Sequence, residues 1–246
     1  MNGFEARTAI VTGAGKRVGA AIADHLSRRG WVVIAHVHDA KDEVPAGAVK
    51  VAAELSDPSC ADVVFQAAEG HGRVHMLVNN AARFAWDGAG EFSASEFDAH
   101  MAMNARAPAL LIERFAGQHD PEQDGLIVNI LDAKLFGPNP DYLSYTLSKQ
   151  ALAGLTDLAA RALASRKIRV NAIAPGLMLQ SAGQSAQNFA AMHARNPLGR
   201  GVEPSDVTGC IDYLVGALCV TGQTIVLDSG QRFLSLERDV QFLGGR

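Results

Sequence analysis

The chain has 246 residues, of which 48% are hydrophobic and 20% are charged, a composition typical of globular proteins that excludes a disordered or fibrous one. The formal net charge is −4 and the basic residues are scattered, so we expect neither nucleic acid nor a membrane as a partner. No apolar run approaches the roughly 20 residues that span a bilayer, and the first residues lack the apolar core of a signal peptide. Three dispersed cysteines show no paired or zinc-ligand spacing, so we expect a cytoplasmic protein without a metal site.

Short apolar runs alternate with longer helical patterns along the chain. Most of the apolar runs are rich in Val and Ile without polar alternation, as in strands that are covered on both faces. The expected strands are residues 8–12, 32–36, 48–52, 76–79, 126–131, 169–174 and 224–228. The expected helices are residues 18–29, 58–69, 95–118, 145–165 and 204–218. This alternation predicts an α/β fold, a Rossmann-type doubly wound parallel sheet of seven strands flanked by helices.

Nothing in the composition divides the chain, so we expect a single domain over residues 1–246. Residues 176–201 differ in texture, because they form a long Gln-, Ser- and Ala-rich segment that follows the end of an expected strand. Ligands of open α/β sheets bind outside the carboxyl ends of the strands, so this segment is a candidate substrate loop or lid. A plain surface loop is the alternative.

A glycine-rich loop, TGAGKRVG at residues 12–19, follows the first expected strand. Its glycines let the backbone turn tightly and approach a pyrophosphate, which the N-terminus of the next helix also attracts. Glycines also serve ordinary strand-to-helix turns, but the position of this loop at the start of a βαβ unit favours dinucleotide binding. The cofactor-binding candidates in the loop are Gly13, Lys16, Arg17, Val18 and Gly19.

The end of the second expected strand indicates which dinucleotide binds. NAD enzymes usually carry an acidic residue there to bind the ribose 2′-hydroxyl, whereas this chain has Val37. Lys16 and Arg17 lie in the opposite loop, where they are expected to meet a 2′-phosphate, and His38 adds a further donor. The carboxylate of Asp39 would repel that phosphate unless it turns away. The pattern predicts NADP(H).

Tyr145 and Lys149 are four residues apart, which places both side chains on one face of a helix. An ammonium beside a phenol favours the phenolate, so we expect the pKa of Tyr145 to lie below its usual value of about 10. Such a tyrosine passes a proton to substrate while a nicotinamide delivers hydride. A half-buried Tyr beside a Lys on an ordinary helix is the structural alternative, and Tyr142 lacks such a partner.

Five features in register resemble the short-chain dehydrogenase/reductase family over essentially the whole chain. They are the glycine loop, the Asn-Asn-Ala-Ala run at residues 79–82, Asn104, the Tyr145/Lys149 pair and Pro175-Gly176. The resemblance implies that Asn104 supports a proton relay to the catalytic lysine. It also implies cofactor contacts for residues after several strands: Glu54, Leu55, Asn80, Ala81, Tyr145, Lys149, Pro175 and Gly176.

Three departures from the usual family pattern resemble the pteridine reductases and dihydromonapterin reductases. Arg17 replaces a glycine, Asp132 replaces the catalytic serine, and Phe84 supplies an aromatic ring after the fourth strand. The resemblance implies a pterin held between the nicotinamide and Phe84, with Arg17, Asp132 and Tyr145 as further substrate contacts. Ala82 departs from this subgroup, which carries a serine there.

The leading hypothesis is therefore an NADP(H)-dependent oxidoreductase that reduces a pterin or dihydropterin, with Tyr145, Lys149, Asp132 and Asn104 as catalytic residues. An ionised carboxylate accepts hydrogen bonds but does not donate them, so Asp132 suits a heterocycle with N–H donors better than a ketone. A general carbonyl or 3-oxoacyl reductase is the alternative. A catalytically silent nucleotide-binding regulator is disfavoured because Tyr145, Lys149 and Asn104 are all retained.

The family resemblance also implies a homotetramer, formed through the two long helices expected at residues 95–118 and 145–165. The tail, residues 233–246, is a candidate cover for the active site of a neighbouring subunit.

Overall fold

The computed structural model describes residues 7–181 and 183–243. Within these residues, seven parallel strands form one sheet, as the sequence predicted, and their order is β3-β2-β1-β4-β5-β6-β7. The strands are β1 (Thr8–Val11), β2 (Val32–Val37), β3 (Val49–Ala52), β4 (Val74–Asn79), β5 (Gly125–Ile130), β6 (Ile168–Pro175) and β7 (Thr224–Leu227). Strands β1, β5 and β6 are buried along their whole length, which explains their unbroken apolar runs.

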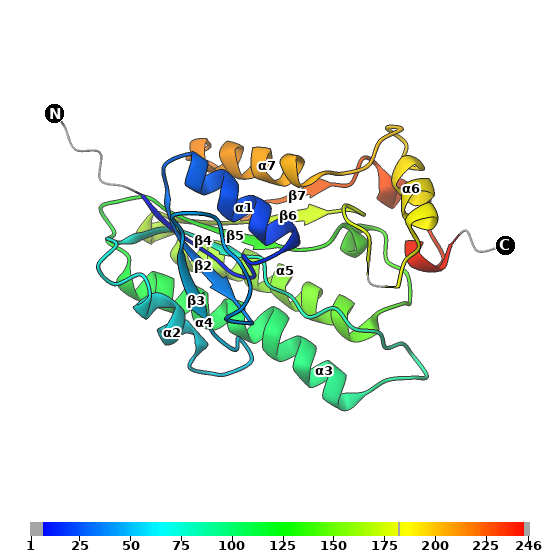
Figure 1. Cartoon of the computed structure of the whole chain (residues 1–246), viewed down its shortest axis with the longest axis horizontal. Coiled ribbons are helices and arrows are strands. Elements are labelled where there is room, and N and C mark those ends of the chain that lie inside the picture. Colours follow the sequence, from blue (N-terminus) through cyan, green and yellow to red (C-terminus); the bar gives the residue numbers. More distant parts are fainter. Residues whose placement is uncertain (1–6, 182, 244–246) are drawn as a thin grey trace.

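Helices cover both faces of this sheet (Figure 1). The helices are α1 (Arg17–Arg28), α2 (Cys60–Gln66), α3 (Ala94–Met101), α4 (Ala107–Gln118), α5 (Leu143–Leu163), α6 (Ala186–Ala194) and α7 (Pro204–Gly216). Helices α1 and α7 pack on one face, where Leu26 and Ile211 are buried against the sheet. Helices α2, α4 and α5 cover the other face, where Phe65 and Phe115 are buried. In the described ranges, no helix has the length and apolar character needed to cross a membrane.

The helix expected at residues 95–118 is divided in the structure. A π-helical turn, Ala102–Arg106, joins α3 to α4. Pro108 lies at the start of α4 and lacks the N–H that an α-helix would donate to the carbonyl of Asn104, so a wider turn is favoured there. The helix expected at residues 58–69 is shorter than expected, and α6 adds a helix inside the expected lid.

The sheet order places the functional residues at one edge. Strand β1 has β2 on one side and β4 on the other. The loop after β1 therefore leads to one side of the sheet and the loop after β4 leads to the other, and the two loops diverge. In doubly wound sheets a crevice forms at this point, outside the carboxyl ends of the strands. The glycine loop after β1 and the segments after β4, β5 and β6 therefore meet there.

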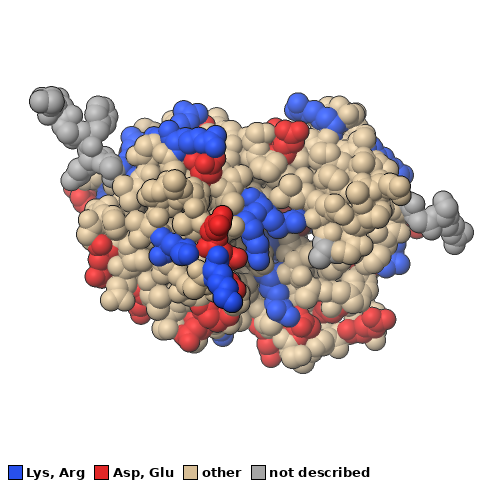
Figure 2. All heavy atoms as spheres, viewed as in Figure 1, with Lys and Arg blue, Asp and Glu red and all other residues tan. Residues whose placement is uncertain are grey.

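Surface charge on the face shown in Figure 2 is mixed. Lys and Arg gather around the middle of this face, with Asp and Glu next to them, rather than forming one continuous basic surface. A mixed surface of this kind offers no extended track for a phosphate backbone.

Candidate active site

A cavity of about 960 Å³ lies at the carboxyl ends of the strands. Its volume is at the upper end of the range of small-molecule sites. All expected site residues belong to the described part of the chain, and all except Asn104 line this cavity. The lining members are Gly13, Lys16, Arg17, Val18, Gly19, His38, Glu54, Leu55, Asn80, Ala81, Phe84, Asp132, Tyr145, Lys149, Pro175 and Gly176.

The glycine loop fits a pyrophosphate because its backbone leaves no room for side chains. Gly13 has φ +67°, a conformation that favours glycine, and a Cβ at Gly19 would lie 2.0 Å from the Gly13 carbonyl oxygen. Asn80 holds the loop from β4, donating from its side chain to the Thr12 carbonyl oxygen at 2.9 Å. The backbone N–H groups of Asn80 and Ala81 both donate to Thr12 Oγ1. The roles expected for Asn80 and Ala81 therefore include shaping this loop.

His36 is a structural part of the site that the sequence analysis missed. Its buried ring lies behind the glycine loop, where Nδ1 accepts a hydrogen bond from the Gly13 N–H at 3.2 Å. Nε2 is 3.0 Å from the Ala53 carbonyl oxygen, so Nε2 carries the proton. Burial lowers the pKa of His36, which favours this neutral form. The ring thereby joins the loop after β1 to the end of β3.

Arg17 has φ +54°, so the structure explains why most family members have a glycine at this position. Its guanidinium donates to the carbonyl oxygens of Gln180 at 2.9 Å and Leu179 at 3.4 Å, both in the candidate lid.

Asp39 turns away from the cavity as an NADP site requires, and its side chain accepts from the Lys41 N–H at 2.9 Å. Asp42, which the sequence analysis did not consider, lines the cavity instead.

On the opposite wall of this region, His38 and Glu54 form an ion pair at 3.4 Å. Glu54 also accepts hydrogen bonds from the backbone and hydroxyl of Ser56, which lower its pKa. Leu55 is buried beside it. At the other end of the cavity, Gly176 follows β6, where a Cβ would lie 2.6 Å from the Gln231 side chain.

Tyr145 and Lys149, which are buried, form one group with the partly buried Asp132. The Tyr145 hydroxyl donates to Asp132 Oδ2 at 2.8 Å, while Asp132 Oδ1 accepts from the Lys134 N–H at 2.8 Å. Lys149 Nζ donates to the Ile130 carbonyl oxygen at 2.7 Å and lies 5.8 Å from the centre of the Tyr145 ring. The helical spacing thus brings Tyr145 and Lys149 together as expected, and β5 adds Asp132 to them.

The pKa of Tyr145 changes in the direction opposite to our expectation. Burial raises it well above its usual value, and the negative charge of Asp132 raises it further. Burial also lowers the pKa of Lys149 to about 8, although Asp132 opposes that shift. Burial, reinforced by the carboxylate at the usual serine position, therefore keeps the Tyr145 phenol protonated, in the form that donates a proton.

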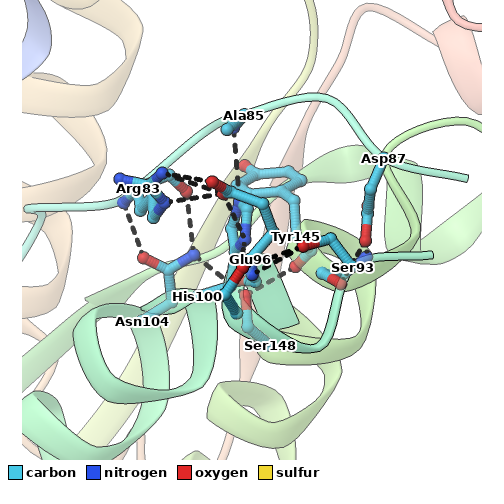
Figure 3. Close-up of polar contacts among 11 residues, drawn as sticks. Arg83, Ala85, Asp87, Ser93, Glu96, His100, Asn104, Tyr145 and Ser148 are labelled. Atoms are coloured by element: carbon cyan, nitrogen blue, oxygen red, sulfur yellow. Dashed lines mark hydrogen bonds and ion pairs between the residues drawn. The ribbon is translucent and has the colours of Figure 1, made fainter. Parts of the chain in front are cut away.

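Asn104 lies in the π-helical turn and holds the segment that follows β4 (Figure 3). Its Oδ1 accepts from the Arg83 N–H at 2.7 Å, and its Nδ2 donates to the Arg83 carbonyl oxygen and to Ser148 Oγ, each at 2.9 Å. The side chain therefore contacts the backbone of residue 83 and helix α5 rather than Lys149. The proton relay expected for Asn104 remains a prediction.

Two further contacts attach the segment that follows β4 to helix α3. His100 is buried and its Nε2 accepts from the Ala85 N–H at 3.2 Å, while Arg83 and Glu96 form an ion pair at 2.8 Å (Figure 3). Phe84 lies between these anchored residues. Its ring stacks on Tyr142 at a centroid distance of 4.2 Å and meets Tyr145 edge-on at 4.8 Å. An aromatic face thus stands directly beside the Tyr145 phenol.

Tyr142 is a second residue that the sequence analysis undervalued. It is buried in a left-handed conformation at the start of α5, with φ +54°. Its hydroxyl donates to Gln241 Oε1 at 2.7 Å, and burial raises its pKa to about 12. Its partner therefore comes from the C-terminal tail, which helical spacing does not predict.

The described part of the C-terminal tail packs on its own chain, and the expected cover of a neighbouring subunit remains a prediction. Arg238 and Asp141 form an ion pair at 2.8 Å within the chain, and Asp239 and Val240 line the cavity. Residues 244–246 of the expected cover lie outside the described residues. The candidate lid lines the other side through Leu179 and Ser181, and its role as a lid remains a prediction.

Comparison with known proteins gives consistent family matches. Residues 13–232 match a family model described as enoyl-(acyl carrier protein) reductase. Pteridine reductase 1 of Leishmania tarentolae is 32% identical, in a match that covers 92% of this chain and 96% of the relative. The 3-oxoacyl-[acyl-carrier-protein] reductase FabG of Staphylococcus epidermidis is 27% identical, covering 91% and 98%.

Solved structures are similar over the same length. FolM alternative dihydrofolate reductase 1 from Brucella canis, complexed with NADP, has a TM-score of 0.88 and 36% identity, covering 93% of this chain and 95% of that one. The similar proteins are reductases, and their names differ in the substrate.

Proposed function

We propose that this chain, which belongs to the short-chain dehydrogenase/reductase family of oxidoreductases, is an NADPH-dependent reductase of a pterin or dihydropterin. The observation that carries the proposal is the hydrogen bond of 2.8 Å between Tyr145 and Asp132, beside the exposed ring of Phe84. The similarity to a pteridine reductase and to an alternative dihydrofolate reductase supports it.

The cavity residues support NADP(H) as the cofactor. The glycine loop has the close backbone approach that a pyrophosphate needs, and Lys16, Arg17 and His38 line the same cavity as cationic or donor groups for a 2′-phosphate. Two similar solved structures of alternative dihydrofolate reductases contain NADP. When bound, NADPH supplies the hydride for the reduction.

The chain's own groups would handle the proton. Tyr145 is neutral and lines the cavity, so its hydroxyl donates a proton to the substrate nitrogen as the adjacent ring carbon is reduced. Asp132 holds that hydroxyl in place. Lys149 lies close enough to favour the tyrosinate that forms, and its proton is readily lost because its pKa is about 8.

The acceptor-only chemistry of Asp132 favours a heterocycle over a ketone. A serine hydroxyl at this position donates a hydrogen bond to a ketone oxygen, whereas a carboxylate repels that oxygen. A pterin presents an N–H of its reacting ring to Asp132 and a flat face to Phe84, which is 46% exposed. Ala82 stands where a serine occurs in pteridine reductases, so one expected polar contact is missing from this site.

A general carbonyl or 3-oxoacyl reductase is the second candidate, favoured by the similarity to FabG and by the description of the matching family model. In that case Asp132 would be tolerated without a role in substrate choice.

The test follows NADPH absorbance with purified protein and a panel of dihydrobiopterin, dihydromonapterin, folate and simple ketones. We expect oxidation of NADPH with pterins, and a loss of about ten- to a hundredfold in kcat/KM when Asp132→Ser removes a hydrogen-bonded charge. Tyr145→Phe serves as the control that abolishes turnover of any substrate. Turnover of ketones alone, or an unchanged pterin rate in Asp132→Ser, contradicts the pterin proposal.

A further inference from the structure

The C-terminal residues 236–243, here called the strap, line the cavity through Leu236, Asp239 and Val240 and attach to the segment just before α5. Arg238 Nε lies 2.9 Å from both carboxylate oxygens of Asp141, and the Asp239 N–H donates to Asp141 Oδ2 at 2.6 Å. Asp141 is itself buried. The strap is therefore fixed to the part of the chain that leads directly into Tyr145.

A second set of contacts fixes the strap beyond Asp239. Gln241 accepts the Tyr142 hydroxyl at 2.7 Å, and the Phe242 ring lies 5.2 Å from Trp86 and 6.2 Å from Tyr142. Asn188 of α6 also donates to the Leu243 carbonyl oxygen. With anchors on both sides, Asp239 is held as part of the cavity wall.

The carboxylate of Asp239 faces the same space as the reacting group. Asp239 lines the cavity together with Asp132, Lys134 and Tyr145, and its side chain is only 19% exposed. Oδ1 accepts the Gln241 N–H at 3.1 Å. Oδ2 forms an ion pair with Lys134 Nζ at 3.8 Å, a distance too long for a direct hydrogen bond. Lys134 Nζ is instead directed to the Asp141 carbonyl oxygen.

A largely buried carboxylate is costly unless strong donors meet it. Asp132 already accepts from the Tyr145 hydroxyl and the Lys134 N–H, so its acceptor capacity is partly used. Oδ2 of Asp239 keeps capacity for a donor that enters the cavity. A pterin carries a ring N–H beside its amino group, and a 2,4-diaminopyrimidine ring gains a ring N–H when a nearby carboxylate favours its protonation. These parallel donors match the two oxygens of a carboxylate.

We propose that Asp239 is a substrate-binding residue, carried by the strap, whose carboxylate accepts hydrogen bonds from the amino and ring N–H groups of an aminopyrimidine. The inference rests on the proposed pterin substrate and names the residue that recognises its amino-bearing edge. Tyr145 and Phe84 would then act on the reacting ring, while Asp239 selects the other ring.

The test measures equilibrium binding, by calorimetry, of 2,4-diaminopteridine and of pteridine-2,4-dione to the NADP-loaded protein. Asp239→Asn keeps an oxygen for the Gln241 N–H and removes the charge, so the strap is expected to stay in place. We expect Asp239→Asn to lower the binding affinity for the diamino probe at least about tenfold, because hydrogen bonds to charged groups contribute more free energy than neutral ones. The dione, with carbonyl oxygens in place of the amino groups, should be affected much less.

Glu237→Gln is the matched control, since it removes one negative charge from an exposed position of the same strap. It should leave both affinities and the thermal midpoint unchanged. Three results would overturn the inference. They are equal affinity of Asp239→Asn and the wild type for the diamino probe, equal losses of affinity for both probes, and no binding of the diamino probe to the wild type. Turnover of dihydropterin is scored separately. Asp239-dependent binding without turnover contradicts only the proposed reaction, and turnover with Asp239-independent binding contradicts only the role of Asp239.

Discussion

Asp132 acts on Tyr145 and on Lys149 in the same direction, because a negative charge favours the protonated form of both groups. Burial acts on the two groups in opposite directions, raising the pKa of the phenol and lowering that of the ammonium. Asp132 therefore reinforces the effect of burial at Tyr145 and opposes it at Lys149. A serine at this position would lack both electrostatic effects.

Replacing Asp132 should therefore change the pH dependence of cofactor binding. Lys149 in the cofactor-free protein is charged below a pKa of about 8 and loses its charge as the pH rises through that value. Asp132→Asn removes the charge that sustains the ammonium, so the pKa should fall and the alkaline limit of NADPH binding should move to lower pH. The check is the Kd of NADPH across a pH series. Asp62→Asn, an 82% exposed carboxylate, should leave the profile in place, and an identical profile in Asp132→Asn would contradict the argument.

For single residues, the sequence predicted which side chains lie together, but not how their contact changes the pKa of Tyr145. The four-residue spacing of Tyr145 and Lys149 is enough to place both on one helical face. The sign of the Tyr145 pKa shift depends on burial and on a distance of 2.8 Å to Asp132, which no sequence pattern contains. His36 gave no signal because a histidine inside an apolar strand has no distinctive spacing, although its ring supports the glycine loop.

Among the elements, the junction of α3, the π-helical turn and α4 controls the position of Phe84. Asn104 holds both backbone groups of Arg83, and His100 holds the N–H of Ala85, so the segment on each side of Phe84 is attached to this junction. The Arg83–Glu96 ion pair adds a contact in which both side chains are over 30% exposed. Backbone anchoring in a buried setting is worth more than such an ion pair.

Comparing Asn104→Ala with Glu96→Gln tests this difference. Asn104→Ala leaves the Arg83 backbone groups without their partner, so we expect it to lower the free energy of unfolding by about 1–3 kcal/mol. It should also raise the KM of the carbonyl or pterin substrate through Phe84. Glu96→Gln removes a partly exposed ion pair and should cost less than about 1 kcal/mol. Chemical denaturation and substrate kinetics measure both effects, and similar losses in the two variants would refute the proposed hierarchy.

The sequence predicted these elements unevenly. Alternating strands and helices were predicted because their Val- and Ile-rich runs are buried on both faces of the sheet. The interruption at residues 102–106 was missed, although Pro108 was a visible signal for it. Helix α6 was missed because its sequence, rich in Ala, Gln and Asn, lacks a clear apolar face, and it begins with a Ser185 cap.

At the scale of the molecule, the C-terminal strap shows why contacts distant in sequence resist prediction. Arg238 and Asp141 are 97 residues apart, and each is unremarkable in its local sequence. The described part of the tail lines the cavity of its own chain, and its expected contact with a neighbouring subunit remains a prediction. The homotetramer remains a separate prediction.

Helices α4 and α5 leave a surface suited to that assembly. Ala105, Ala109 and Leu155 line a shallow hollow there, and Leu158 on α5 is 66% exposed. If the expected tetramer forms through these helices, Leu158→Glu places buried charges in the contact and should shift the protein to smaller species. Sedimentation velocity measures this change. Leu218→Glu, at a 63% exposed position after α7, is the control that should leave the assembly intact. A wild type that sediments as a monomer would disprove the tetramer.

Arg17 links the candidate lid to the expected binding site of the cofactor phosphate. Its guanidinium holds the backbone of Leu179 and Gln180 in the candidate lid, and it is also the group expected to meet the cofactor 2′-phosphate. Because one guanidinium has a limited number of donors, its two partners compete for them. When Arg17 binds the phosphate, the stabilisation that it gives the closed lid is then lost. By linkage, lid closure weakens the phosphate contact to the same extent. If residues 176–201 act as a lid, we therefore expect cofactor affinity and lid position to form one thermodynamic cycle, with Arg17 as its coupling residue.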